Sequence, residues 1–300
     1  MHPNAILKLC RTALSRWLAD RAPQLAAALA YYAVFSLAPL LVLALAMAGT
    51  FLGEAAARGQ IVGQVQALVG PESARLLVNV LEGARPPEPG SWASALSALV
   101  LLFGASGVFA QLQDALNTIW LEQSQRGIVG FIGKRLLSFV MVVLVGLLVL
   151  LSLLLSASIS ALSQLEGQSL LGWDLLWLWR ALSFLLDFAI VTLLFATIYK
   201  FLPDVRIAWS DVGVGAVLTA VLFTLGKALL GLYLETSGFG SAYGAAGALV
   251  VLLAWVNYSA QIFLLGAEFT QAYATRYGSQ IVPSDARGRL QSLARRWPRS

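Results

Sequence analysis

Cysteine and histidine are almost absent from the sequence: Cys10 is the only thiol and His2 the only imidazole among 300 residues. One thiol excludes a disulfide within the chain. One imidazole, at position 2, leaves no material for a histidine zinc site, a Ser-His-Asp triad or a histidine acid–base pair. We therefore predict a protein that is not an enzyme, with no catalytic residues, no metal and no cofactor.

A glycine-rich phosphate loop is missing as well. The GVG sequence at 213–215 has neither the spacing nor the preceding strand that a dinucleotide fingerprint requires. We interpret these glycines as sites of close helix packing. Gly240, Gly244 and Ala248, which recur every four residues, indicate close packing in the same way.

Charged residues are also scarce, at 12% of the sequence against roughly 25% in a soluble domain, whereas 59% of residues are hydrophobic. A helix needs about 20 apolar residues to cross a hydrocarbon core of roughly 30 Å. Six segments reach this length, and the period-two alternation of a closed barrel is missing. We predict an all-α, polytopic membrane bundle with six transmembrane helices, near 25–52, 92–112, 136–163, 174–201, 209–234 and 242–273.

Lysine and arginine predict the orientation of this bundle. If the six spans alternate in direction, fifteen of the 20 basic residues fall on one side, three on the other, and Arg180 and Lys227 lie within spans. Basic residues favour the cytoplasmic side. We therefore expect both termini in the cytoplasm. The first apolar run far exceeds the roughly 7–15 residues of a signal-peptide core, so we expect it to be a retained anchor.

The N-terminal segment, residues 1–24, predicts an amphipathic helix on the cytoplasmic side. One face carries apolar residues and the other polar and basic ones: Ile6, Leu7, Cys10, Leu14, Trp17 and Leu18 against Lys8, Arg11, Thr12 and Ser15. Such a helix either lies on the anionic inner leaflet or packs on its own protein. At the other end of the chain, residues 274–300 form a basic cytoplasmic tail.

The longest external connection, residues 53–91, also has helical spacing in both halves. Its apolar residues recur every three or four positions, and Pro71 suits the first position of a helix. We predict a helical hairpin over the outer face of the 25–273 domain. It is either a lid on a cavity or a stiff loop.

Charged side chains within spans are costly, at ~2.5–3.5 kcal/mol each at the bilayer centre. Arg180 and Asp187 lie two turns apart on span four, and Lys227 lies on span five at the depth of Arg180. Two cations above one carboxylate leave a positive charge that would hold an anion such as a phosphate. The alternative is an Asp187–Lys227 pair that joins the two spans, with Arg180 extending to the outer interface.

Span six carries a polar stripe. At about 100° per residue, Asn257, Gln261 and Glu268 fall within roughly 40° of one another. We predict that the stripe faces the protein interior, with the amides available to bond across helices. Glu268 lies near the cytoplasmic interface, where a basic partner is Lys200 or Arg276.

Two tyrosines are further candidates. Tyr31 lies early in span one, where it belongs either to an interfacial aromatic belt or to a cavity lining. In the same span Pro39 removes one helix hydrogen bond, for which Ser36 offers a local replacement. Tyr243 extends the span-six stripe toward the outer side, so we include it with the cavity residues.

Four segments carry a family resemblance: LAYYAVFSLAPLL at 29–41, FAQLQDALNTIW at 109–120, the stretch that begins YKFLPDVRIAW at 199, and GSAYGA through LLGAE at 240–268. Together they resemble the YihY/virulence factor BrkB family over about residues 10–278. The resemblance implies a six-helix protein of the bacterial cytoplasmic membrane, linked in some members to serum resistance and envelope biology. By resemblance we carry over Tyr31, Pro39, Gln113, Asn117, Pro203, Lys227, Tyr243, Gly244, Gln261 and Glu268, whereas Thr118 and Asn257 depart from the pattern.

An older label of this family is tRNA-processing ribonuclease. One histidine and no carboxylate cluster at metal-ligand spacing argue against carrying that label over, and we expect no nucleic-acid partner. The hypothesis we favour is a transporter or translocator of an anionic amphiphile or lipid, with the anionic inner leaflet as a further partner. The alternative is a non-transporting scaffold for envelope integrity or serum resistance, in which buried polar groups serve only helix packing.

Overall fold

The computed structural model describes residues 3–70, 73–75, 78–79, 92–120, 128–166, 174–237, 244–278 and 282–283. Nearly all of these are helical, which confirms the predicted fold class. Six of the described helices are long and apolar enough to cross a membrane, and they overlap the six predicted spans. They are α2 (Ala22–Leu52), α5 (Trp92–Ile119), α6 (Ile128–Glu166), α7 (Asp174–Phe201), α8 (Trp209–Ser237) and α10 (Gly244–Arg276).

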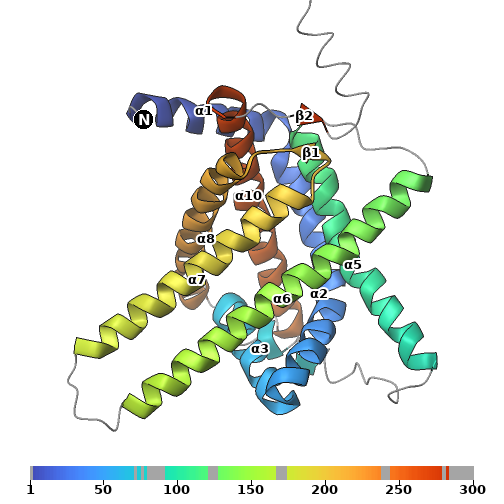
Figure 1. Cartoon of the computed structure of the whole chain (residues 1–300), viewed down its shortest axis with the longest axis vertical. Helices are drawn as coiled ribbons and strands as arrows, with labels where there is room; N and C mark the ends of the chain where they lie inside the picture. Colours follow the sequence, from blue (N-terminus) through green and yellow to red (C-terminus); the bar gives the residue numbers. More distant parts are fainter. Residues whose placement is uncertain are drawn as a thin grey trace, which may run out of the picture.

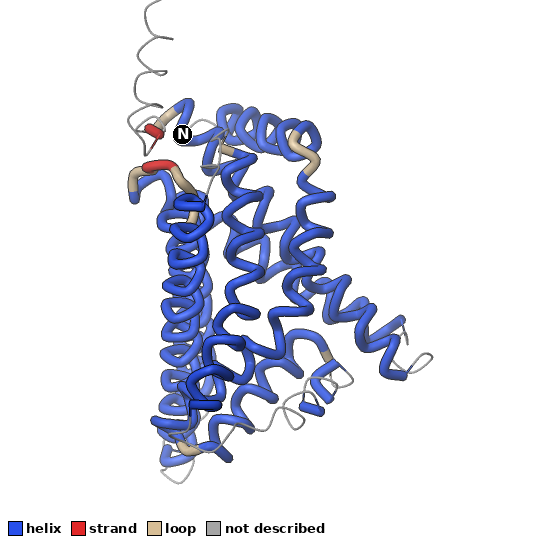
Figure 2. Tube along the Cα trace, turned by 90° about the vertical axis from the view of Figure 1, so that its right-hand side faces the viewer, coloured by secondary structure: helices blue, strands red, loops and turns tan. Residues whose placement is uncertain are grey.

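The helices run between two ends of the molecule. At one end, called the terminal end below, lie α1 (Pro3–Ala19) and the short strands β1 (Val205–Arg206) and β2 (Val282–Pro283). At the other, called the α3 end, lies α3 (Glu54–Val69) (Figure 1). Helix α10 is central, because it contacts α1, α2, α5 and α8. Both described ends of the chain lie at the terminal end, as an even number of crossings requires (Figures 1 and 2).

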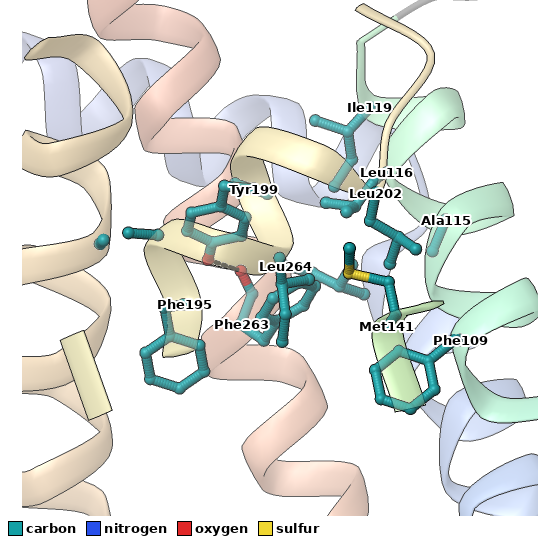
Figure 3. Packing of buried hydrophobic residues seen from close by; sticks show 14 of the residues in the cluster. Phe109, Ala115, Leu116, Ile119, Met141, Phe195, Tyr199, Leu202, Phe263 and Leu264 are labelled. Carbon is teal, nitrogen blue, oxygen red and sulfur yellow. Dashed lines mark hydrogen bonds between the residues drawn. The ribbon is translucent and has the colours of Figure 1, made fainter. Parts of the chain in front are cut away.

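The largest buried cluster joins α5, α6, α7 and α10 near the terminal end. Tyr199 is fully buried at its centre, and its hydroxyl donates to the Phe263 carbonyl oxygen at 2.6 Å (Figure 3). The same hydroxyl lies 3.1 Å from Thr219 Oγ1, so α7 is joined to α8 and α10 at one point. Leu116 and Leu264 are buried beside it without exposed surface. Apolar packing and satisfied hydrogen bonds therefore hold the terminal end together.

Helix α3 packs onto the spans at the opposite end. Ala57 and Ile61 of α3 belong to a second buried cluster, together with Leu41, Ala48, Leu150 and Leu252. Further along the chain, the Ser73 hydroxyl donates to the Ala248 carbonyl oxygen at 3.1 Å. The first half of the predicted hairpin is thus a helix that covers α2, α6 and α10, whereas most of the second half lies outside the described residues.

Helix α2 continues through Pro39, but Ser36 does not replace the missing hydrogen bond locally. The Ser36 hydroxyl instead donates to the Gly104 carbonyl oxygen of α5 at 2.9 Å, so our prediction of a local bond is wrong. A side chain at Gly104 would place its Cβ 3.0 Å from Pro39 Cγ. Glycine therefore allows α5 to approach the proline closely enough for the serine to reach across.

Helix α1 lies across the terminal end instead of along the bundle axis (Figures 1 and 2). Leu9 and Ala13 are buried against α10, a face that the amphipathic pattern did not identify. Of the predicted apolar face, Leu7, Leu14 and Leu18 are 74%, 51% and 63% exposed, whereas Trp17 packs against the bundle. The helix therefore packs on its own protein through one face and presents a second, apolar face outward.

Candidate functional site

Two amides of α5 hold the connection between α7 and α8. Asn117 Nδ2 donates to Asp204 Oδ2 at 2.8 Å, and the Asp204 backbone N–H donates to Asn117 Oδ1 at 3.0 Å. Gln113 Nε2 donates to Asp204 Oδ1 at 3.2 Å. Both amide side chains are buried and Asp204 is half-buried, whereas Gln113 Oε1 has no hydrogen-bond partner among the described residues. Pro203, next to Asp204, is buried in the same connection.

The same connection is held from its other side by the antiparallel pairing of β1 with β2, in which Val205 lies opposite Pro283. Lys200, at the end of α7, donates to the Ile207 carbonyl oxygen and lies 5.5 Å from the ring centroid of Trp209. Lys200 is therefore engaged within the connection. It is not the partner of Glu268 that the sequence suggested.

Sequence reasoning missed Asp204, although Gln113, Asn117 and Pro203 were all selected. The residue lies in the quoted LPDVR segment, where an aspartate between two spans has the appearance of an ordinary turn residue. A signal was present nonetheless: two amides spaced four residues apart on one face of an apolar helix need a polar partner.

Glu268 is fully buried in α10, and among the described residues no donor reaches either of its carboxylate oxygens. The charged groups that act on it are Asp20, which follows α1, and Arg16 of α1. The second predicted partner, Arg276, instead lies 5.6 Å over the ring of Tyr277. Both predicted partners are therefore wrong, because the N-terminal helix occupies this side of α10.

Arg16 and Gln271 link α1 to the rest of the bundle beside Glu268. The guanidinium donates to Gln271 Oε1, and Gln271 Nε2 donates to the Ile119 carbonyl oxygen of α5 at 2.8 Å. The next residue of α1, Trp17, donates through Nε1 to the Gln261 carbonyl oxygen at 3.3 Å. These contacts fix α1, α5 and α10 relative to one another.

The amides of the polar stripe bond to each other along α10. Gln261 Nε2 donates to Asn257 Oδ1 at 2.6 Å, the spacing of one helical turn, and both side chains are half-buried. Glu268 alone is fully enclosed. The stripe thus becomes more buried toward the terminal end, and the hydrogen bond between these two amides stays within the helix.

Asp187 of α7 and Lys227 of α8 do not pair with each other. Asp187 and Lys227, both among the residues the structure describes, are exposed, and no ion pair joins them. The predicted Asp187–Lys227 pair is therefore not formed. Arg180 belongs to α7, but its side chain lies outside the described part, so a site that combines it with Lys227 stays a prediction.

Both exposed charges lie on helix faces that are buried nearer the terminal end. Eleven residues make slightly more than three helical turns, so residues at this spacing share a face. Ile198, eleven residues after Asp187 on α7, is only 7% exposed, and Ala216, eleven residues before Lys227 on α8, is 0% exposed. The same faces are exposed toward the α3 end, where α7 runs obliquely away from α8 and alongside α6 (Figure 1).

Tyr31 does not join this group. Tyr31 is 60% exposed on α2, with its ring 4.8 Å from that of Phe35 and 5.8 Å from that of Tyr32. This aromatic group lies on the surface of the helix, where a membrane belt would place it. Tyr243 lies outside the described residues.

Six apolar helices, with a further helix lying across one end, define a polytopic α-helical membrane protein. Residues 13–290 match the model of the family described as "Virulence factor BrkB", and the chain belongs to this family. No solved structure matches it.

Relatives in several bacteria are each named "UPF0761 membrane protein". The chain is 33% identical to the protein of Tolumonas auensis over 180 residues, which cover 59% of this chain and 56% of the relative. It is 29% identical to that of Glaesserella parasuis over 177 residues, 58% and 59% of the two chains. It is 25% identical to that of a Psychrobacter species over 276 residues, 91% and 49%. The chain thus spans about half the length of the curated relatives it matches.

Proposed function

We propose that this protein moves an anionic amphiphile or lipid of the cell envelope in the bacterial cytoplasmic membrane, with both termini in the cytoplasm and no enzymatic step. One observation carries the proposal: Lys227 is an exposed cation, without an ion-pair partner among the described residues, in a membrane span. A bare cation at the bilayer centre costs ~2.5–3.5 kcal/mol. An anionic headgroup would offset that cost by a charge-assisted contact.

The packing of α7 and α8 supports a lateral route to Lys227. Near the terminal end these helices are held together around Tyr199 and Thr219, whereas Leu185 and Leu225 are 65% and 58% exposed nearer the α3 end. An amphiphile entering from the lipid would meet apolar side chains first and the cation beside them. By its sequence position, Arg180 would add a second cation to this site.

The anionic inner leaflet is a proposed second partner, at α1. Its outward face combines three exposed leucines with exposed Lys8 and Arg11. Apolar burial and attraction of about 1 kcal/mol per basic residue would hold such a helix in the lipid surface. In this arrangement α1 anchors the terminal end at the cytoplasmic interface.

The scaffold hypothesis remains the competing function, and a specific observation favours it. Gln113, Asn117 and Asp204 bond to one another at the terminal end, as polar groups do when they serve helix packing. A scaffold would need no exposed cation in a span, so Lys227 is the residue that separates the two functions.

The test measures movement of labelled anionic phospholipid between leaflets of liposomes that contain the purified protein. Lys227→Gln removes the charge and is expected to slow movement about tenfold or more, since a hydrogen bond to a charged group contributes about 1.5–3 kcal/mol. Lys227→Arg restores the charge and the movement. Arg276→Gln, which removes an exposed charge at the terminal end, is the matched control and leaves the rate unchanged.

A rate of lipid movement equal to that of protein-free liposomes in every sample would exclude translocation of this lipid and favour the scaffold function. An equal rate of lipid movement for wild type and Lys227→Gln would exclude the proposed role of the lysine. A fall in folded yield without a change in rate per folded molecule would assign Lys227 to stability.

A further inference from the structure

Tyr258, in the middle of α10, carries a hydroxyl that is available to a ligand. The side chain is half-buried, and its hydroxyl makes no hydrogen bond within the part of the chain that the structure describes. Unlike the carboxylate oxygens of Glu268, the hydroxyl oxygen is not enclosed by the protein. All residues of 255–261 are likewise half-buried, whereas most of those in 262–274 are buried. The central helix is therefore accessible along the stretch that carries this hydroxyl.

The phenol of Tyr258 lies against α8 beside Lys227. A Cβ at Gly226 would lie 2.7 Å from both the hydroxyl oxygen and Cε1 of Tyr258, so the ring rests on the backbone of α8 at this glycine. Gly226 is buried there, and the next residue, Lys227, is exposed. Because consecutive Cα atoms are about 3.8 Å apart, the flexible stem of Lys227 starts within reach of the phenol.

Lys227 shares a face of α8 with Phe223, which lies one turn earlier. The ring centroid of Phe223 is 6.1 Å from that of Trp255 on α10 and 5.6 Å from that of Phe195 on α7. This face of α8 is therefore directed between α7 and α10. Past the aromatic contact α7 diverges from α8 (Figure 1), and the lysine on the next turn is exposed.

We propose that Lys227 and Tyr258 together bind the phosphate of a phospholipid headgroup, to which the lysine supplies a positive charge and the tyrosine hydroxyl donates a hydrogen bond. The site rests on the function proposed for Lys227 and adds a second helix and a class of ligand to it. Lysine binds phosphate as a point charge, which leaves other phosphate oxygens to accept from a second donor. The acyl chains lie against exposed apolar side chains such as Leu185 and Leu225.

Native mass spectrometry of the detergent-solubilised protein measures binding of phosphatidylglycerol, whose only charge is on its phosphate. Tyr258→Phe keeps the ring, removes the hydroxyl and is expected to weaken binding about tenfold, as the loss of a hydrogen bond to a charged group does. Lys227→Gln weakens binding at least as much. In the double variant the loss is smaller than the product of the two, because both contacts are made to one phosphate. Tyr277→Phe, which removes an exposed hydroxyl at the terminal end, is the matched control and binds as wild type does.

Equal binding by wild type and Tyr258→Phe would overturn the site, and so would fully independent losses in the double variant. Displacement of the lipid by inorganic phosphate in large excess would assign the site to a free anion and overturn a lipid ligand. Melting temperatures identify any variant that does not fold.

Movement of the same lipid in liposomes separates this site from the proposed translocation. Binding that depends on both residues, without any movement, would reject translocation and retain the site. Movement that depends on Lys227 but is unchanged in Tyr258→Phe would retain translocation and overturn the shared site.

Discussion

At the scale of single residues, the two glycines of the GVG sequence have different surroundings. A Cβ at Gly215 would lie 2.8 Å from Thr270 Cβ and closer still to the threonine hydroxyl, whereas a Cβ at Gly213 would meet nothing within 4 Å. The Thr270 hydroxyl itself donates to the Gly266 carbonyl oxygen at 2.7 Å. Close helix packing, predicted for both glycines, therefore applies to Gly215 alone.

This difference predicts opposite effects for the same substitution two residues apart. Gly215→Ala is expected to destabilise the protein by about 1–3 kcal/mol, since the methyl group forces α8 away from α10. Gly213→Ala is neutral or stabilising by up to about 1 kcal/mol, because alanine favours a helix over glycine. Melting temperatures in detergent measure both. Equal losses would contradict the packing at Gly215.

The residues of the candidate site were predictable from the sequence only one at a time. Gln113 and Asn117 were carried over from the family resemblance, Glu268 was also selected as a charged group within a span, and all three are buried. Asp204, the partner of both amides, was not selected, because it comes from a segment distant in the sequence. Spacing on one helix fixes a face, but it does not determine which other segment covers that face.

At the scale of elements, α1 shows why a single amphipathic pattern was insufficient. The pattern separated apolar from basic residues, yet Leu9 and Ala13 form a further buried face against α10. A helix has room for three faces around its circumference, so packing on the protein and contact with lipid do not exclude each other. The spans were easier to predict, because a continuous apolar run needs no partner to be recognised.

Cys10 offers a direct test of the outward face of α1. It is exposed and is the only cysteine in the sequence, so a fluorescent maleimide labels one known position. In liposomes with anionic lipid, brominated lipids are expected to quench the label more strongly than aqueous iodide does. Changing both Lys8 and Arg11 to Gln weakens lipid quenching, since each contributes about 1 kcal/mol of attraction. Quenching by iodide alone would exclude lipid contact at this helix.

At the scale of the whole molecule, the bundle is closed at the terminal end and less covered toward the α3 end. Tyr199 and the Gln113–Asn117–Asp204 bonds hold one end, whereas charged Asp187 and Lys227 are exposed between the two. The number of spans followed from hydropathy, and the common end of the two termini followed from their even number. The divergence of α7 from α8 could not be predicted, because it depends on the angle at which the helices cross.

The orientation of the molecule is open to a labelling test in whole cells. Gly59 of α3 is exposed and has space for a side chain, so Gly59→Cys in a Cys10→Ser background places one thiol at the α3 end. A membrane-impermeant maleimide is expected to label this thiol in intact spheroplasts and to label Cys10 of the wild type only after lysis. Labelling of Cys10 in intact spheroplasts would reverse the orientation.

The pairing of β1 with β2 implies an order of events during synthesis. Strand β2 follows α10, so it emerges from the ribosome after all six spans have been translated. Until then the connection between α7 and α8 is held by Asn117 and Gln113 of α5 and by Lys200 of α7. Strand β2 therefore pairs with a segment that was translated 78 residues earlier. A nascent chain that stalls before Val282 would contain all six spans but lack this strand pairing.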